Sequence, residues 1–338
     1  MGSLFCPPRK ISFIMKTFQE ILDLFNQALA AMPLDRKPET LYAPIRYALS
    51  LGGKRLRPVL LLMAYNLYLD DVEAAMPTAL GIETFHNFTL LHDDVMDRAD
   101  VRRGKPTVHK VWNDNAAILS GDNMLVMAFQ LMAQAQPQYL KSVIDLFART
   151  AMEIDEGQQQ DIDFESRMDV KEEEYIEMIR LKTSVLLACA LKLGAIQAGA
   201  PAADAELLYK FGEQLGLSFQ LQDDLLDVYG DFKTFGKKIG GDILCNKKTF
   251  MLINALRQAT PVQRAELEDW LTRERFDPAE KVRAVTELYN QIGIRRMAEE
   301  RINLYFDAAL ASLADVALPA ERKQPLLDFA HTLLGRKS

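Results

Sequence analysis

Cysteine and histidine are both scarce in this chain of 338 residues, which contains 3 cysteines and 4 histidines. Cys6, Cys189 and Cys245 lie far apart and form no CxxC pair, so neither a zinc knuckle nor a disulfide framework is expected. This cysteine usage fits the reducing cytoplasm. No uncharged run approaches the roughly 18 residues of a membrane-spanning helix, so no transmembrane segment is expected.

Excess positive charge is also missing. Lysine and arginine total 40 against 47 acidic residues, and the resulting net charge of −7 argues against a nucleic-acid partner. An anionic substrate is still compatible with this charge, because a local basic pocket or a bound metal can invert the field. The first segment, MGSLFCPPRKISFI, has too short an apolar stretch for a signal sequence. Residues 1–14 are therefore interpreted as an N-terminal extension without an assigned function.

Strand-like alternation is rare, whereas apolar residues recur every three or four positions along most of the chain. Glycine and proline separate these segments at Gly52-Gly53, Gly199-Ala200-Pro201 and Asp277-Pro278. The pattern predicts one all-α domain over residues 15–338, with roughly ten or more helices. The segment TSVLLACALKLGAI is apolar on all sides, as in the interior of a bundle or in the subunit contact of a homodimer.

The sequence does contain one acidic motif twice, as Asp93-Asp94-Val-Met-Asp97 and as Asp223-Asp224-Leu-Leu-Asp227. In a helix the first and last aspartates of each motif share a face, where like charges are destabilising by about 0.2–0.5 kcal/mol per pair. A solvated helix end would explain either motif alone. Both motifs in the same apolar context indicate a cation, and oxygen-only ligands suit Mg²⁺ bound to a phosphate.

Basic residues provide candidate anion sites. Lys54 and Arg57 follow a glycine pair, where the backbone can approach an anion, and Arg102 and Arg103 follow the first aspartate motif. Arginine binds phosphate through two parallel hydrogen bonds, whereas lysine acts as a point charge. Either cluster alone is more often surface charge. Together with the acidic motifs, they indicate a protein that handles two phosphorylated substrates.

From about residue 16 onward, these motifs and their order resemble the trans-isoprenyl diphosphate synthases of the polyprenyl synthetase family. The resemblance implies the isoprenoid synthase fold, a helical bundle around a central cavity. It also implies head-to-tail coupling of an allylic diphosphate with isopentenyl diphosphate. This coupling requires no side-chain nucleophile, and the chain has no G-x-S-x-G motif.

The resemblance assigns roles to individual residues. About three magnesium ions per active site are implied, with the ligands Asp93, Asp97, Asp161, Asp223 and Asp227. Gln158 accompanies Asp161 in a GQxxD motif. Catalytic roles fall on Asp93, Asp94, Asp97, Lys182, Thr183, Asp223 and Lys237. Substrate contacts fall on Lys54, Arg57, His86, Arg102, Arg103, Gln220 and Lys247.

The length of the product depends on the side chains below the first motif, because a growing prenyl tail must run between helices. Thr89 lies one turn before Asp93, and Phe88 precedes Thr89. In the family, a bulky residue followed by a small one at these positions is typical of short-chain enzymes. This sequence most closely resembles the pattern of the C20 enzymes. We expect a geranylgeranyl product first, a C15 product second and longer chains third. Further wall candidates, each also explained by core packing, are Ile82, Phe85, Met124, Met127 and Phe129.

Other classes of protein fit less well. A terpene cyclase would share the first motif, but it would not need an isopentenyl site at Lys54, Arg57 and His86. A non-catalytic subunit of a heteromeric synthase would be expected to lose aspartates, and all of them are present. Glu83 and His86 form half of a di-iron bundle site. No other histidine has a glutamate three residues before it, so the second half of that site is missing.

Overall fold

The computed structural model describes residues 15–230 and 239–335, and helices dominate both ranges. The first helices are α1 (Phe18–Ala30), α2 (Glu39–Ser50), α3 (Leu56–Asn66), η1 (Glu73–Ala75), α4 (Met76–Met96), α5 (Val108–Val111), α6 (Asp114–Met132) and α7 (Pro137–Glu165). They are followed by α8 (Glu172–Ile179), η2 (Arg180–Ser184), α9 (Val185–Gln197), α10 (Ala202–Tyr229), α12 (Gly241–Leu244), α13 (Phe250–Gln258), α14 (Pro261–Thr272), α15 (Pro278–Ile292), α16 (Ile294–Ala314) and α17 (Ala320–Leu334). The predicted all-α fold is confirmed.

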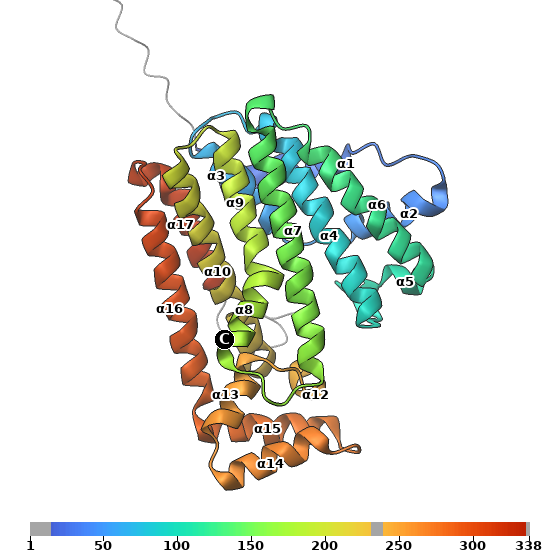
Figure 1. Cartoon of the computed structure of the whole chain (residues 1–338), viewed down its shortest axis with the longest axis vertical. Coiled ribbons are helices and arrows are strands. Elements are labelled where there is room, and N and C mark those ends of the chain that lie inside the picture. Colours follow the sequence, from blue (N-terminus) through green and yellow to red (C-terminus); the bar gives the residue numbers. More distant parts are fainter. Residues whose placement is uncertain (1–14, 231–238, 336–338) are drawn as a thin grey trace, which may run out of the picture.

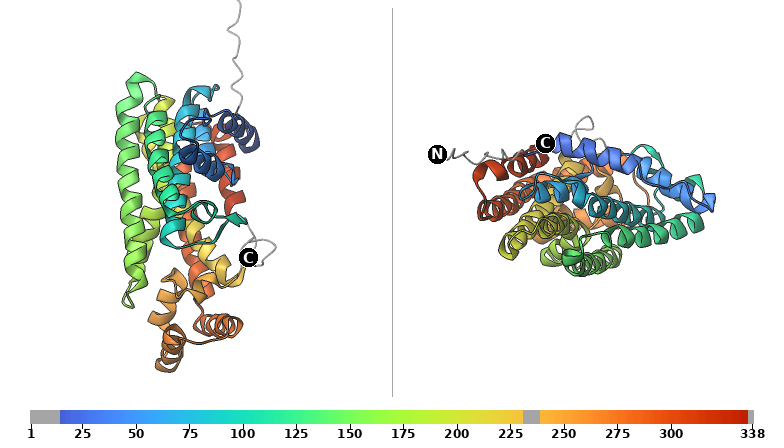
Figure 2. Two further views of the ribbon diagram at one scale, coloured as in Figure 1. Left: turned by 90° about the vertical axis from the view of Figure 1, so that its right-hand side faces the viewer. Right: turned by 90° about the horizontal axis from the view of Figure 1, so that it is seen from above.

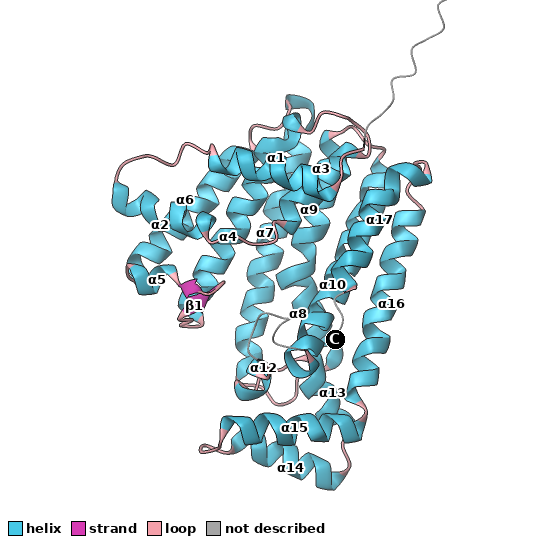
Figure 3. Cartoon of the chain, turned by 180° about the vertical axis from the view of Figure 1, so that it is seen from behind, coloured by secondary structure: helices cyan, strands magenta, loops and turns pink. Residues whose placement is uncertain are grey.

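Strand structure within the described ranges is limited to one short antiparallel hairpin, formed by β1 (Val101–Arg102) and β2 (Lys105–Pro106). The hairpin follows the C-terminal end of α4 and lies beside α5 (Figure 3). It turns the chain back immediately after the first aspartate motif. No helix in the described part of the chain combines the length and apolar character needed to cross a bilayer.

The long helices α4, α6, α7, α9, α10 and α16 run roughly lengthwise, and α14 and α15 lie across one end (Figures 1 and 2). Helix α9 is the centre of this bundle, because it packs against α3, α7 and α10 and buries nearly all of its side chains. Each fully buried leucine contributes roughly 1.5–3 kcal/mol. This interior position, rather than a subunit contact, explains why the helix is apolar on all sides.

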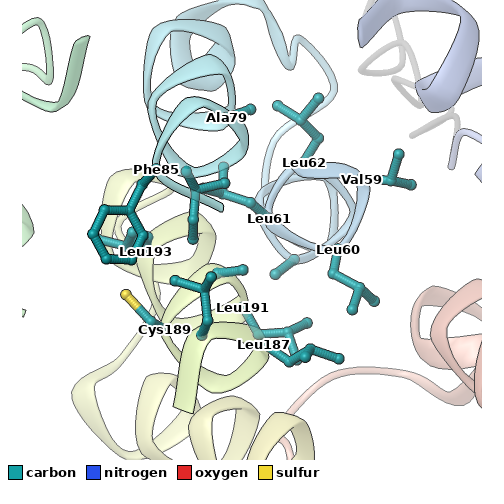
Figure 4. Packing of buried hydrophobic residues seen from close by; sticks show 14 of the residues in the cluster. Val59, Leu60, Leu61, Leu62, Ala79, Phe85, Leu187, Cys189, Leu191 and Leu193 are labelled. Carbon is teal, nitrogen blue, oxygen red and sulfur yellow. The ribbon is translucent and has the colours of Figure 1, made fainter. Parts of the chain in front are cut away.

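Two hydrophobic cores meet along α10 and α16. The larger one lies among α1–α4, α6, α7 and α9, and the smaller one lies among α8 and α12–α15. Figure 4 shows the larger core where α3, α4 and α9 come together, with Phe85 of α4 beside Leu193 and Cys189 of α9. The predicted break at Asp277-Pro278 is confirmed, because Asp277 caps α15 there. Thr17 caps α1 in a capping box with Glu20.

Candidate active site

The first aspartate motif closes the C-terminal end of α4, and its three carboxylates face different surroundings. Asp94 is buried and is held by Arg102, whose Nε lies 2.8 and 2.9 Å from the two carboxylate oxygens. The hairpin brings Arg102 back to this position. Asp93 is half-buried and Asp97 is exposed. These two residues lie one turn apart and share a face of the helix that does not include Asp94. The ion pair with Arg102 therefore fixes the Asp94 carboxylate, and the carboxylates of Asp93 and Asp97 face other partners.

Helix α7 and the segment η2 complete this side of the site. The Lys182 ammonium of η2 lies 2.6 Å from the Asp161 carboxylate of α7. Burial raises the pKa of Asp93, and this rise is opposed by Lys182 and reinforced by Asp97. Asp93, Asp161 and Lys182 therefore interact across three elements. The sequence predicted all of these residues, and the structure brings them together.

The segment that carries Lys182 and Thr183 is a turn of π-helix, in which the Val185 N–H donates to the carbonyl of Arg180. Such turns are uncommon and occur frequently at functional sites. Helix α7 meets this turn at Gly157, where a Cβ atom would lie 2.4 Å from the backbone nitrogen of Lys182. No side chain fits between the two backbones, so Gly157 sets the distance between Asp161 and Lys182.

In the second aspartate motif, on α10, the middle carboxylate is again taken by the protein. Asp224 is buried, accepts a hydrogen bond from the Tyr175 hydroxyl of α8 and lies 3.2 Å from the Gln220 amide. Burial and the neighbouring Asp242 raise the pKa of Asp224 to about 7. Sequence reasoning missed Tyr175, because nothing in its spacing indicates which helix it faces. Asp223 is half-buried on the same helix.

The last residue of the second motif joins α10 to the following segment. Asp227 is buried and accepts a hydrogen bond of 3.0 Å from the backbone N–H of Asp242. This N–H belongs to the first turn of α12, so Asp227 supports the segment that leads to Lys247. This hydrogen bond thereby ties the second aspartate motif to the segment that carries Lys247.

Lys247 links the two acidic motifs electrostatically. Desolvation in the cleft alone would lower its pKa, but the surrounding carboxylates raise that pKa above its ordinary value. These carboxylates are Asp161, Asp242, Asp224 and Asp97, in order of decreasing effect. They come from both sides of the cleft, so Lys247 marks the place where the two halves of the acidic site meet.

The donor atoms around this cleft suit a hard divalent cation. The carboxylates supply oxygen only, and the buried Oε1 of Gln158 accepts no hydrogen bond from the described residues. Across residues 15–230 and 239–335, no three carboxylate, histidine or cysteine side chains converge closely enough to hold a metal ion. Two of the carboxylates instead form ion pairs within the chain, Asp161 with Lys182 and Asp94 with Arg102.

A separate basic site lies across the cleft. Arg57 Nη1 of α3 lies 3.1 Å from His86 Nε2 of α4. Burial and the adjacent Arg57 and Arg103 lower the pKa of His86 well below its ordinary value, so the imidazole is neutral and Nε2 accepts from Arg57. The buried Nε of Arg57 donates to no described residue. An unpartnered arginine donor beside further cations is what an anion site requires.

Neighbouring residues complete or border the basic site. Burial and the nearby Arg103 lower the pKa of Arg57 to about 10, with Glu83 opposing the shift. Glu83 is buried against Arg55, 2.5 Å from its guanidinium, so the half-site for di-iron is occupied by an ion pair. Arg103 donates to the carbonyl of Gly52. Lys54 is exposed in the same glycine-containing loop, and Lys237 lies outside the described residues.

A cavity of ≈ 240 Å³ connects the basic site with the acidic one. Its polar lining includes Arg57, His86, Asp93, Lys182, Thr183 and Gln220. The Thr183 hydroxyl donates to the Gln220 side-chain oxygen over 3.3 Å. Residues predicted from separate motifs therefore line one space, which can hold two anionic groups close together.

A cluster of aromatic rings adjoins this cavity at Phe88. Phe88 lines it and is 8 % exposed, with its ring centroid 5.5 Å from that of Phe85. Phe85 in turn packs edge-on against Phe147 at 5.1 Å, and Phe147 packs against Phe129 at 4.9 Å. Phe147 was missed by sequence reasoning because it is remote from the motifs, on α7. Thr89 donates its hydroxyl to the His86 carbonyl and also lines the cavity.

The family follows from a comparison with known proteins. The polyprenyl synthetase family model matches residues 38–290, which is most of the chain. The chain belongs to the polyprenyl synthetase family.

The polyprenyl synthetase has named relatives of similar length. A geranylgeranyl diphosphate synthase of Methanosarcina mazei is 42% identical over 229 residues, which cover 67% of this chain and 70% of the relative. A geranylfarnesyl diphosphate synthase of Natronomonas pharaonis is 39% identical over 259 residues, covering 71% and 76%. A crystal structure of a geranylgeranyl pyrophosphate synthase superposes with a TM-score of 0.91 at 43% identity, covering 96% of this chain and 100% of that chain.

Proposed function

We propose that this polyprenyl synthetase couples an allylic diphosphate head to tail with isopentenyl diphosphate, and that its product is geranylgeranyl diphosphate. The observation that carries the proposal is the single cavity with Arg57 and His86 at one side, Asp93 and Lys182 at the other, and Phe88 within. Two phosphorylated substrates and one apolar tail match these three surfaces. The polyprenyl synthetase domain is proposed to span residues 15–338, since helices outside the matched range contribute to the same cores.

Magnesium is the metal that this donor set suits. The proposed ligands are Asp93, Asp97, Asp161, Asp223 and Asp227, for about three ions per site. When bound, magnesium neutralises the diphosphate leaving group and so assists cleavage of the allylic C–O bond. The unpartnered Oε1 of Gln158 is placed to accept from a water molecule near that group.

The residues of the chain then have distinct tasks. Lys182, Lys247, Lys237 and Arg102 are proposed to stabilise the departing pyrophosphate. Arg57, His86, Arg103 and Lys54 are proposed to hold isopentenyl diphosphate so that its double bond attacks the allylic cation. The proton that is lost passes to the pyrophosphate. The apolar wall around Phe88 keeps water away from the cation, and Thr183 and Gln220 provide oxygen dipoles beside it.

The proposed reaction is tested by product analysis. Isopentenyl diphosphate is supplied with C5, C10 or C15 allylic primers, and the products are separated by mass spectrometry. A C20 product from each primer supports the proposal, and a C15 or C25 product corrects its length. Pyrophosphate release from the C10 or C15 primer without isopentenyl diphosphate would indicate a cyclase and overturn the proposal.

Truncating Phe88 is expected to lengthen the product. Phe88→Ala removes the ring that lines the cavity above Phe85, so the tail can grow past the position where it now stops. The share of products longer than C20 should rise by about tenfold, measured by mass spectrometry with a C15 primer. Tyr305→Ala, at a half-buried position outside this cavity, is the control. An unchanged product distribution in Phe88→Ala would remove Phe88 from this role.

A homodimer is proposed on the outer face of α6. Leu119 and Val126 lie two turns apart on this helix and are 60 % and 56 % exposed, with Ile118 beside them at 44 %. A second copy of the chain would cover these side chains. Leu119→Glu combined with Val126→Glu is expected to give monomers by light scattering, whereas Leu304→Glu, at an exposed position on α16, should not. A dimer that persists in the double variant would place the contact elsewhere.

A further inference from the structure

We infer that His92 and Gly121 act as a pair that fixes the position of Phe88 and thereby helps to set the length of the product. The inference rests on the proposed function, because product length has meaning only for an elongating enzyme. His92 lies one turn after Phe88 on α4, and both line the cavity. Their rings meet edge to face, with centroids 4.7 Å apart and planes inclined by 67°.

Phe88 is held from two sides. Phe85 lies 5.5 Å away by ring centroids, and Phe85 is itself fixed against Phe147. His92 supplies the other contact. The rotamer of Phe88 therefore depends on whether the imidazole stays where it is, since interiors are packed closely enough to transmit such shifts.

Helix α6 provides the seat for this imidazole. The ring lies directly against Gly121, where a Cβ atom would stand 2.2 Å from Nε2 and 2.5 Å from Cδ2. Nε2 lies 3.1 Å from the Ile118 carbonyl oxygen, so this nitrogen carries the proton and donates it. The Asp122 carboxylate lies 3.9 Å from the same nitrogen. This carboxylate, the hydrogen bond and the missing side chain at Gly121 together hold the ring in place.

Substitutions of Gly121 and of His92 are expected to change the product length in opposite directions. Any side chain at 121 would occupy the space of the imidazole, so the ring must shift. The ring already lines the cavity, so we expect it to shift into that space and leave the tail less room. Removing the imidazole is expected to have the opposite effect, because Phe88 loses one of its two ring contacts and can turn away from the tail.

The alternative is that His92 merely packs α4 against α6 and does not influence the tail. The two explanations differ in how the variants combine. If His92 acts through Phe88, then His92→Ala changes the product in the unmodified chain but adds nothing in a Phe88→Ala background. If His92 only packs the helices, the product lengths stay the same while stability falls.

The experiment uses the full-length chain with isopentenyl diphosphate and a C5 primer, and it reads the ratio of product lengths by mass spectrometry. This ratio does not depend on the amount of active enzyme, which matters because His92 adjoins Asp93 and its variants can lose overall turnover. His92→Ala should raise the share of longer products by about two- to tenfold, the range expected for the loss of one aromatic contact. Gly121→Ala should raise the share of shorter products by a similar factor.

Gly81→Ala is the matched control. Gly81 also lies where α4 meets α6, with a Cβ position 3.2 Å from the Ala128 carbonyl, but it does not line the cavity. This variant should leave the ratio unchanged. If Gly121→Ala does not fold alone, the double variant with His92→Ala has room for the new methyl group and should behave as His92→Ala does. His92→Leu retains the packing volume and should also lengthen the product.

Several results would overturn the inference. It fails if His92→Ala and His92→Leu both give the original product ratio, or if His92→Ala lengthens the product by the same factor with and without Phe88. These outcomes are distinct from failure of the proposed function, in which the unmodified chain itself yields no elongated product.

Discussion

Asp93→Ala is expected to lower turnover by about 10³-fold, the scale seen when one electrostatic contact to a reacting centre is removed. The reason lies in its position. Asp93 shares the cleft with Asp97 and Asp161, opposite the ammonium of Lys182. Without its carboxylate, the proposed magnesium site would lose one of its oxygen ligands, and the leaving group would lose part of its stabilisation. Asp223→Ala on the opposing helix is expected to act in the same way.

The same substitution should not weaken the fold. The pKa of Asp93 is raised, first by burial and also by Asp97, which means that the ionised carboxylate is less favourable in the folded chain than in the unfolded one. Above the unfolded pKa, this residue therefore subtracts from the free energy of unfolding. Asp93→Ala should have a melting temperature equal to or above that of the unmodified chain. A cluster of like charges that serves function is expected to lower the stability of the fold in this way.

The measurement pairs pyrophosphate release with thermal unfolding followed by circular dichroism. Asp163→Ala is the control for charge, because Asp163 is exposed on α7 and bonds only to the neighbouring Gln159 among the contacts described for its side chain. This control should retain its turnover. Near-normal activity in Asp93→Ala would remove Asp93 from the metal site, whereas a lower melting temperature would show that the carboxylate is structural.

Much of the site was predictable from local spacing. The i, i+4 relation places Asp93 and Asp97 on one face whatever the tertiary structure, and glycine and proline breaks mark helix ends in the same way. The breaks at Gly52-Gly53 and before Pro278 are confirmed by the ends of α2 and α14 and the starts of α3 and α15. Periodicity also identified α9 as a helix that is buried on every side.

Contacts between distant segments were not predictable in this way. The middle aspartates differ from their neighbours because Arg102 and Tyr175 bind them, and only the packed structure shows which face each helix turns inward. The π-turn at Lys182 gives no signal in apolar spacing, because the following helix α9 is apolar on all sides and a shift of its pattern by one residue cannot be seen. The same holds for His92, whose seat against α6 depends on a glycine remote in the sequence.

Gly157→Ala is expected to damage both stability and activity. By helix propensity alone, alanine in the middle of α7 should stabilise the chain by roughly 1 kcal/mol. The new methyl group would instead lie 2.4 Å from the backbone nitrogen of Lys182 and 2.8 Å from Cβ of Leu181. Overpacking of this kind typically costs about 1–3 kcal/mol and outweighs the propensity gain, because the obstacle is backbone and cannot rotate away.

The cost to turnover should exceed the cost to stability. Separating α7 from the π-turn moves Asp161 away from Lys182, now 2.6 Å apart, and a displacement of about 1 Å at a reacting centre can reduce the rate by roughly 10²-fold. Glu156→Ala, at the adjacent exposed position of α7, is the matched control and should change neither quantity appreciably. The measurements are the melting temperature and pyrophosphate release. A higher melting temperature with full activity would mean that the backbones of α7 and η2 do not touch at Gly157, and the geometry that joins Asp161 to Lys182 would need another cause.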